Sequence, residues 1–255
     1  MDLAGRVALV TGGATGIGRA TVLGLARAGV AGVAINFRAS SAAAGAVAAE
    51  ARELGVEPLC IQADVSKEAD VRAMAETVRD RFGRLDLLVN NAGVTHWVPI
   101  DDLDGLTDEV WRDILEVDLV GAFRCIRAAA PLLKQTRGAV VNVTSVSAFI
   151  ASPTTSSLAY GAAKAALVYL TRGLAVALAP EVRVNAVAPC FTDTRWMQSH
   201  YGDEYPQRLS RAAANIPLGR VASPEDVAAA IVSLAAGSDF VTGQILAVDG
   251  GLMLS

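Results

Sequence analysis

Short runs of β-branched and other apolar residues alternate along the chain with longer segments rich in alanine and leucine. The short runs predict strands at residues 6–11, 33–37, 58–63, 85–90, 139–144, 183–188 and 244–248. The longer segments predict helices at residues 16–28, 40–54, 67–82, 107–136, 158–179 and 224–236. This alternation predicts an α/β fold, in which one doubly wound domain over residues 1–255 has a mostly parallel sheet with helices on both faces.

One stretch, residues 192–217, follows neither period and is rich in aromatic and polar residues. A long irregular segment inside a compact domain is usually functional, so we expect a lid or substrate loop here. Candidates for lining the substrate pocket are His96, Trp97, Trp196, Tyr201 and Tyr205. The alternative is that each ring packs within its own loop.

Composition narrows the possible functions. The formal net charge is −4 and no run of basic residues occurs, so we expect no nucleic-acid partner. Cys60, Cys125 and Cys190 are far apart in the sequence, which predicts reduced thiols in a cytoplasmic protein. His96 and His200 have no second ligand near them in sequence, so no metal site is predicted. No apolar segment reaches the roughly 20 residues of a membrane span, so we expect no membrane partner.

A glycine-rich turn at residues 11–18 follows the first predicted strand and opens the first helix. Gly12, Gly16 and Gly18 allow a tight turn and a close approach of a pyrophosphate to the backbone. The helix N-terminus then offers free N–H groups to that anion. The spacing differs from the generic dinucleotide fingerprint, so a glycine-rich turn without a ligand is the alternative for this motif alone.

Five motifs in order resemble the short-chain dehydrogenase/reductase family over residues 3–252. They are the turn at residues 11–18, Asp64-Val65, Asn90-Asn91-Ala92-Gly93, the YxxxK pattern of Tyr160 and Lys164, and a late group with Pro189, Thr194 and residues 248–251. The resemblance implies a Rossmann-type oxidoreductase that moves a hydride between a nicotinamide and an alcohol or carbonyl carbon of a small molecule. It also implies a cytoplasmic homo-oligomer, either a dimer or a homotetramer.

The resemblance also implies which residues bind the nicotinamide cofactor. They are Gly12, Thr15, Gly16, Ile17, Gly18, Asp64, Val65, Asn91, Ala92, Gly93, Tyr160, Lys164, Pro189, Thr192 and Thr194.

The choice of nicotinamide depends on the residue after the second strand, where an acid selects the free ribose hydroxyl of NAD. Arg38 stands there, 20 residues after Gly18, and its guanidinium can pair with a 2′-phosphate. NADP(H) is therefore favoured and NAD(H) stays possible. The family's second NADP signal, a basic residue inside the glycine turn, is missing because Thr15 stands there. The alternative is that Arg38 is a solvated residue at the start of a helix.

Tyr160 and Lys164 are four residues apart, which places both side chains on one face of a helix. An ordinary tyrosine has a pKa of about 10, and a neighbouring ammonium lowers that pKa. Tyr160 is thereby predicted to give a proton to a carbonyl oxygen, or to take one from an alcohol. The resemblance implies that Lys164 also holds the nicotinamide ribose.

A hydroxyl group is needed opposite Tyr160 to hold the substrate oxygen. Alignment of the end of the fifth strand with the family identifies Ser145, whereas the usual spacing before the tyrosine identifies Ser147. We prefer Ser145, because strand ends align better than loops.

Two positions differ from the family pattern. Asp118 stands where the family has a catalytic asparagine, and Cys190 stands where it has a glycine. We expect Asp118 to belong to the catalytic set, although it could instead point away and offer only its carbonyl oxygen. Cys190 is either a reactive thiol beside the nicotinamide or a small space-filling residue, and we favour the second. Asp118 and Cys190 are also the only support for a different function, a non-catalytic dinucleotide-binding regulator.

Overall fold

The computed structural model describes residues 1–151 and 156–254. Within these residues the backbone forms one seven-stranded, parallel sheet with the order β3-β2-β1-β4-β5-β6-β7. The strands are β1 (Val7–Val10), β2 (Gly32–Phe37), β3 (Glu57–Gln62), β4 (Leu87–Asn90), β5 (Ala139–Val143), β6 (Arg183–Pro189) and β7 (Ile245–Val248). Each lies within two residues of its predicted bounds, and the predicted doubly wound fold is confirmed.

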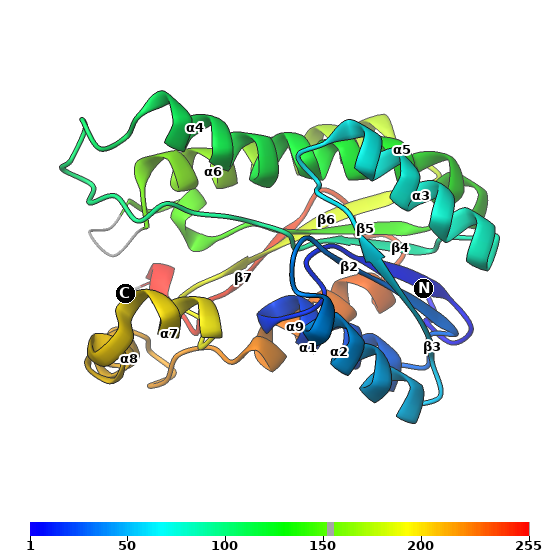
Figure 1. Cartoon of the computed structure of the whole chain (residues 1–255), viewed down its shortest axis with the longest axis horizontal. Helices are drawn as coiled ribbons and strands as arrows, with labels where there is room; N and C mark the ends of the chain where they lie inside the picture. Colours follow the sequence, from blue (N-terminus) through cyan, green and yellow to red (C-terminus); the bar gives the residue numbers. More distant parts are fainter. Residues whose placement is uncertain (152–155, 255) are drawn as a thin grey trace.

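Helices cover both faces of this sheet (Figure 1). One layer contains α1 (Gly16–Arg27), α2 (Ser41–Glu53) and α9 (Pro224–Ala236). The opposite layer contains α3 (Glu68–Phe82), α4 (Asp108–Leu115), α5 (Ala122–Thr136) and α6 (Leu158–Ala177). The central strands are buried on both faces by these two layers, which explains why their sequences are mostly apolar and do not alternate.

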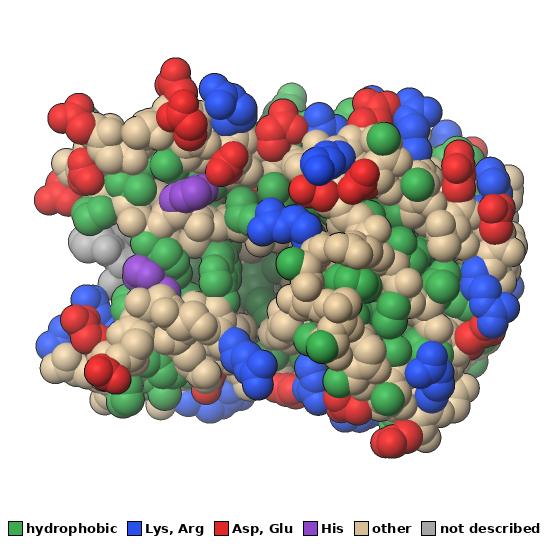
Figure 2. Space-filling model, viewed as in Figure 1, with side chains coloured by type: hydrophobic (Ala, Val, Ile, Leu, Met, Phe, Trp, Pro, Cys, Tyr) green, Lys and Arg blue, Asp and Glu red, His purple; other side chains and the backbone are tan. Residues whose placement is uncertain are grey.

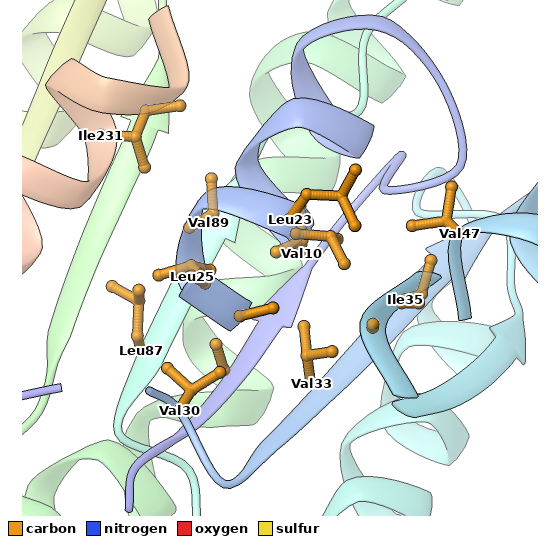
Figure 3. Packing of buried hydrophobic residues seen from close by; sticks show 14 of the residues in the cluster. Val10, Leu23, Leu25, Val30, Val33, Ile35, Val47, Leu87, Val89 and Ile231 are labelled. Atoms are coloured by element: carbon orange, nitrogen blue, oxygen red, sulfur yellow. The ribbon is translucent and has the colours of Figure 1, made fainter. Parts of the chain in front are cut away.

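Two hydrophobic clusters hold the layers to the sheet. Under α1, the side chains of Leu23 and Leu25 pack with Val10, Val33 and Val89 from three neighbouring strands (Figure 3). On the opposite face, α5 contributes a second cluster that includes strand residues pointing the other way. Both clusters are built mainly from aliphatic side chains.

The strand order reverses direction between β1 and β4. The chain runs from β1 to β2 and β3 at one edge, and then returns to place β4 on the other side of β1. In open α/β sheets, ligands bind at the carboxyl ends of the strands beside such a switch point. The glycine turn after β1 and the Asn90-Asn91-Ala92-Gly93 motif after β4 both lie there.

The helix predicted over residues 107–136 is present as a continuous helical segment, but its middle is π-helical instead of α-helical. α4 ends at Leu115 and α5 begins at Ala122, and residues Glu116–Gly121 between them form a π-helical segment. Such segments occur often at functional sites, and this one contains Asp118. The extra residue in the turn changes the direction of the side chains, which the 3.6-residue pattern could not indicate.

The irregular loop predicted at residues 192–217 is also wrong, because most of it is helical. It contains α7 (Arg195–Tyr201), a 3₁₀ turn (Gly202–Glu204) and α8 (Tyr205–Ala214). Thr194 starts α7 by accepting a hydrogen bond from the Met197 N–H at 3.5 Å. Neither helix buries a residue fully, so no apolar period marks them in the sequence.

Candidate active site

The glycine turn has the geometry of an anion cradle. Gly12 and Gly16 adopt left-handed φ angles of +61° and +52°, and a Cβ on Gly18 would overlap the Gly12 carbonyl oxygen. The Thr15 side chain precedes α1 but makes no capping hydrogen bond with its first turn. Those N–H groups can therefore serve the pyrophosphate of a dinucleotide, and the residues present fit such a cofactor. Thr194 lies close by, with Cγ2 3.5 Å from the position of a Cβ on Gly16.

Three polar side chains hold the glycine turn against the neighbouring strands. The Asn91 amide donates to the carbonyl oxygens of Thr11 and Gly12, at 2.9 and 3.1 Å. The Thr11 hydroxyl accepts from the N–H groups of Asn91 and Ala92, both at 3.0 Å. Asn36 accepts from the Gly12 N–H at 3.2 Å. Asn91 thus shapes the cradle, whereas direct contact with the cofactor stays a prediction.

Sequence reasoning did not single out Asn36, although a signal was present. It is the one polar residue in β2, and its buried amide also donates to the Ala63 carbonyl oxygen at 3.0 Å. A buried amide in an apolar strand requires partners, so its position beside the glycine turn indicates a structural role for it there.

The residues predicted to bind the adenosine end lie after β2 and β3. Arg38 follows Phe37 directly and is exposed. Burial would raise the pKa of Asp64, but hydrogen bonds from Ser66 and the charges of Arg38 and Lys67 lower that pKa overall. Val65 beside it is buried. This places a cation close to where a ribose 2′-substituent is predicted to bind.

Lys164 and Asp118 form a buried ion pair. Lys164 Nζ lies 2.7 Å from Asp118 Oδ1, and the two side chains are 5% and 0% exposed. Asp118 Oδ2 accepts from the Val94 N–H at 2.8 Å, and Lys164 Nζ donates to the Val143 carbonyl oxygen at 3.1 Å. Gly93 makes room for the pair, since a Cβ there would lie 2.9 Å from Asp118 Oδ1. Asp118 therefore points toward Lys164, and the alternative in which it points away is wrong.

Tyr160 lies beside this pair, with Ser145 near its phenol. The Tyr160 ring centroid is 5.4 Å from Lys164 Nζ, as expected for residues one helical turn apart. The Ser145 hydroxyl is close enough to lower the pKa of the Tyr160 phenol by hydrogen bonding. The Ser147 backbone N–H donates to Ser145 Oγ, at 3.1 Å. The geometry thus favours Ser145 over Ser147 as the hydroxyl opposite Tyr160, while its catalytic role stays a prediction.

The side chains of Tyr160 and Lys164 affect each other's pKa values, and Asp118 affects both. Burial raises the pKa of Tyr160 and Asp118 adds to that shift, while Lys164 and the Ser145 hydrogen bond act against it. Burial alone would lower the pKa of Lys164, but attraction to Asp118 and to Tyr160 raises that pKa overall. The pKa of Tyr160 is raised overall, so the lowering predicted from Lys164 is wrong, because burial outweighs the nearby ammonium. Lys164 therefore stays charged, and Tyr160 is a neutral phenol at neutral pH.

The carboxyl end of β6 forms the remaining side of the site. Pro189 ends the strand, and the buried Thr192 hydroxyl donates to the Cys190 carbonyl oxygen at 2.9 Å. Burial raises the pKa of the Cys190 thiol to about 11, and Asp249 adds to that shift. A thiol with such a pKa is protonated at neutral pH and is a weak nucleophile, which favours the space-filling interpretation.

Comparisons with known proteins match the chain over nearly its whole length. Residues 12–253 match a family model described as enoyl-(acyl carrier protein) reductase. A short-chain type dehydrogenase/reductase from Mycobacterium marinum has a similar structure, with a TM-score of 0.90 and 32% identity, covering 100% of this chain and 98% of that one. The chain belongs to the short-chain dehydrogenase/reductase family. The resemblance carried by the five motifs is thereby confirmed.

Two curated relatives of this short-chain dehydrogenase/reductase are named as 3-oxoacyl-[acyl-carrier-protein] reductases. The protein from Synechocystis is 39% identical over 256 residues, covering 99% of this chain and 98% of the relative. The protein from Staphylococcus aureus is 38% identical, covering 97% and 98%. The chain is thus a nicotinamide-dependent oxidoreductase acting at a carbonyl or hydroxyl carbon, and these relatives give no support to the non-catalytic regulator.

In residues 1–151 and 156–254, no three His, Cys, Asp or Glu side chains come together as a metal site. His96 instead faces an acid on α4, with Nε2 3.3 Å from Asp113 Oδ2. None of the helices described has both the length and the apolar character needed to span a membrane.

Replacing Asp118 with asparagine is expected to move the basic limb of alcohol oxidation to lower pH. The carboxylate raises the pKa of Tyr160, so removing its charge lets the tyrosinate form at lower pH. The measurement is kcat/KM for alcohol oxidation as a function of pH in the parent and Asp118→Asn. Glu116→Gln is the matched control, since that acid lies in the same π-helical segment but pairs with Arg124. Identical profiles for parent and Asp118→Asn would show that the carboxylate does not couple to Tyr160.

Proposed function

We propose that this enzyme uses NADPH to reduce the ketone of a 3-oxoacyl thioester to a hydroxyl group. The observation that carries the proposal is the position of Tyr160, whose ring centroid is 5.4 Å from a lysine that is paired with Asp118 at 2.7 Å, with the Ser145 hydroxyl close to the phenol. A neutral phenol held there is suited to give a proton, which is the role that ketone reduction requires. The 3-oxoacyl group is taken from the names of relatives that match over the full length.

The residues divide the work of this reaction as follows. Ser145 donates a hydrogen bond to the ketone oxygen, and Tyr160 transfers its phenolic proton to the same oxygen. When bound, NADPH would supply the hydride that the ketone carbon accepts. The Lys164 ammonium and the Asp118 carboxylate set the electrostatic potential at Tyr160, and a proton from solvent then restores the phenol. The glycine turn and Thr194 would hold the pyrophosphate region of the cofactor, and Lys164 would also hold the ribose.

The preference for NADPH rests on Arg38. Its guanidinium is exposed at the carboxyl end of β2, and no acid follows that strand directly. A charge-assisted hydrogen bond from arginine to the 2′-phosphate favours NADPH, and NADH lacks that group. We also expect a cytoplasmic homo-oligomer, either a dimer or a tetramer. Light scattering after gel filtration measures the number of subunits directly.

Reduction of two matched thioesters tests the proposed substrate. The N-acetylcysteamine thioesters of 3-oxobutanoate and 2-butenoate have acyl chains of equal length but offer a ketone and a carbon–carbon double bond, respectively. We expect NADPH consumption, followed by absorbance, with the 3-oxobutanoyl thioester and none with the 2-butenoyl thioester. Consumption with the 2-butenoyl thioester alone would support enoyl reduction instead. Consumption with simple ketones but not with the 3-oxobutanoyl thioester would contradict a thioester substrate.

A further inference from the structure

An aromatic cluster joins two segments that border the active site: the loop after β4, and the segment that runs from the end of β6 through α7 and α8. Its rings come from the loop after β4, the loop after β6, α7 and α8: they are Trp97, Phe191, Trp196, His200, Tyr201 and Tyr205. Two of the three tryptophans and two of the four tyrosines of the chain are in it. The two large hydrophobic cores are built mainly from aliphatic side chains, so these rings are concentrated outside them.

Both sides of the aromatic cluster belong to segments that also border the reacting groups, through hydrogen bonds on one side and chain adjacency on the other. Trp97 is three residues beyond Val94, whose N–H donates to Asp118. The Val98 N–H donates to the Ser156 carbonyl oxygen at 2.8 Å, just before the helix that contains Tyr160. On the other side, Phe191 follows Cys190 at the end of β6. The molecular surface is hollowed between the α4–α6 layer and the α7–α8 segment (Figure 2).

The rings of the two segments contact one another. Trp97 and His200 are stacked, with centroids 3.6 Å apart and planes at 6°. Trp97 also meets Trp196 and Tyr201 at 6.2 and 5.6 Å. Phe191 stacks with Tyr201 at 6.2 Å. The two segments therefore meet through flat faces, a geometry that favours another flat ring over a saturated chain.

One carboxylate fixes the position of the α7–α8 rings. Asp193 Oδ1 accepts hydrogen bonds from the Tyr205 hydroxyl at 2.6 Å and from the Gln198 amide at 3.0 Å. Trp196 keeps 46% of its surface exposed, so part of its ring is accessible. Exposed aromatic faces held in place beside a reaction site are suited to bind a ligand.

We infer that the aromatic cluster selects ketones that bear a planar conjugated ring, with Trp97 and Trp196 as specificity-determining residues. This deepens the proposed function and rests on it only for the thioester part of the substrate. A flat ring can enter an offset or edge-to-face arrangement with these tryptophans, whereas a cyclohexyl group of similar size has no π face.

A pair of substrates that differ only in ring type tests this inference. They are the N-acetylcysteamine thioesters of 3-oxo-3-phenylpropanoate and 3-oxo-3-cyclohexylpropanoate. The measured quantity is the phenyl-to-cyclohexyl ratio of kcat/KM in the parent, Trp97→Leu and Trp196→Leu. Comparing the ratio between proteins cancels the different intrinsic reactivity of the two ketones. We expect it to fall by about 3- to 10-fold in each variant, since leucine keeps apolar bulk without a π face.

Phe240→Leu is the matched control, because this ring is 99% exposed and lies outside the aromatic cluster. Its ratio should equal that of the parent. An unchanged ratio in Trp97→Leu and Trp196→Leu would overturn the inference. If Trp97→Leu does not fold, the Trp196→Leu variant, which changes an exposed side chain, still tests the inference.

Two further measurements separate this inference from the proposed function. Acetophenone and cyclohexyl methyl ketone give the same ratio without a thioester, so the ring preference can be measured even if neither thioester is reduced. Calorimetric titration of both ketones into Tyr160→Phe with NADPH measures recognition without turnover. Equal affinity for both ketones there, together with unchanged kinetic ratios, would overturn the inference while leaving thioester reduction unaffected.

Discussion

Replacing Tyr160 with phenylalanine is expected to lower kcat by about 10²- to 10⁴-fold, the usual contribution of positioned acid–base catalysis. The substitution removes one oxygen atom and keeps the ring, so the packing of α6 against α4 should be preserved. NADPH affinity, measured by titration of cofactor fluorescence, should stay within a few-fold of the parent. Loss of turnover with retained cofactor binding distinguishes a missing proton donor from a damaged fold.

The matched control is Tyr169→Phe on the same helix. Tyr169 is 80% exposed and loses the same hydroxyl group, so this variant should keep the parent kcat. If Tyr160→Phe kept more than about a tenth of the parent kcat, well above the residual activity expected without acid–base catalysis, the acid–base role of Tyr160 would be wrong.

Replacing Arg38 with alanine is expected to remove most of the preference for NADPH over NADH. A hydrogen bond to a charged group contributes about 1.5–3 kcal/mol, which corresponds to roughly 10- to 150-fold in affinity. The dissociation constant of NADPH should rise by this factor, and that of NADH should change little, because NADH lacks the 2′-phosphate. Both constants can be measured by fluorescence titration at one fixed salt concentration.

A second exposed arginine controls for the loss of one positive charge. Arg79 on α3 pairs with its neighbour Asp80 at 2.9 Å, so Arg79→Ala should leave both dissociation constants unchanged. Equal affinity of the parent for NADPH and NADH would contradict the assignment of Arg38 directly.

The fold was predictable because it follows from short-range patterns of apolar residues that are repeated along the chain. Each strand is a short apolar run and each long helix an amphipathic one, so β1–β7 lie within two residues of their predicted bounds. α7 and α8 were missed for the corresponding reason. Neither helix has a fully buried residue, so their sequences lack the helical period of apolar residues that burial against a core requires.

The site was predictable where one motif contains both partners. Tyr160 and Lys164 are one helical turn apart, and their proximity follows from the helix itself. The choice between Ser145 and Ser147 depended on the length of a loop, which spacing alone does not define. Only the folded chain brings the Ser145 hydroxyl close to the Tyr160 phenol.

The sequence by itself determined the alternating elements, the glycine turn and the Tyr160–Lys164 pair, because each depends on residues close together in the chain. The tertiary structure decided what joins distant segments. It placed Asp118 on Lys164 by way of a π-helical turn, and it brought Trp97 onto His200 from over a hundred residues away. Contacts of this kind depend on how the helices and loops pack over the sheet, and no short stretch of sequence carries that information.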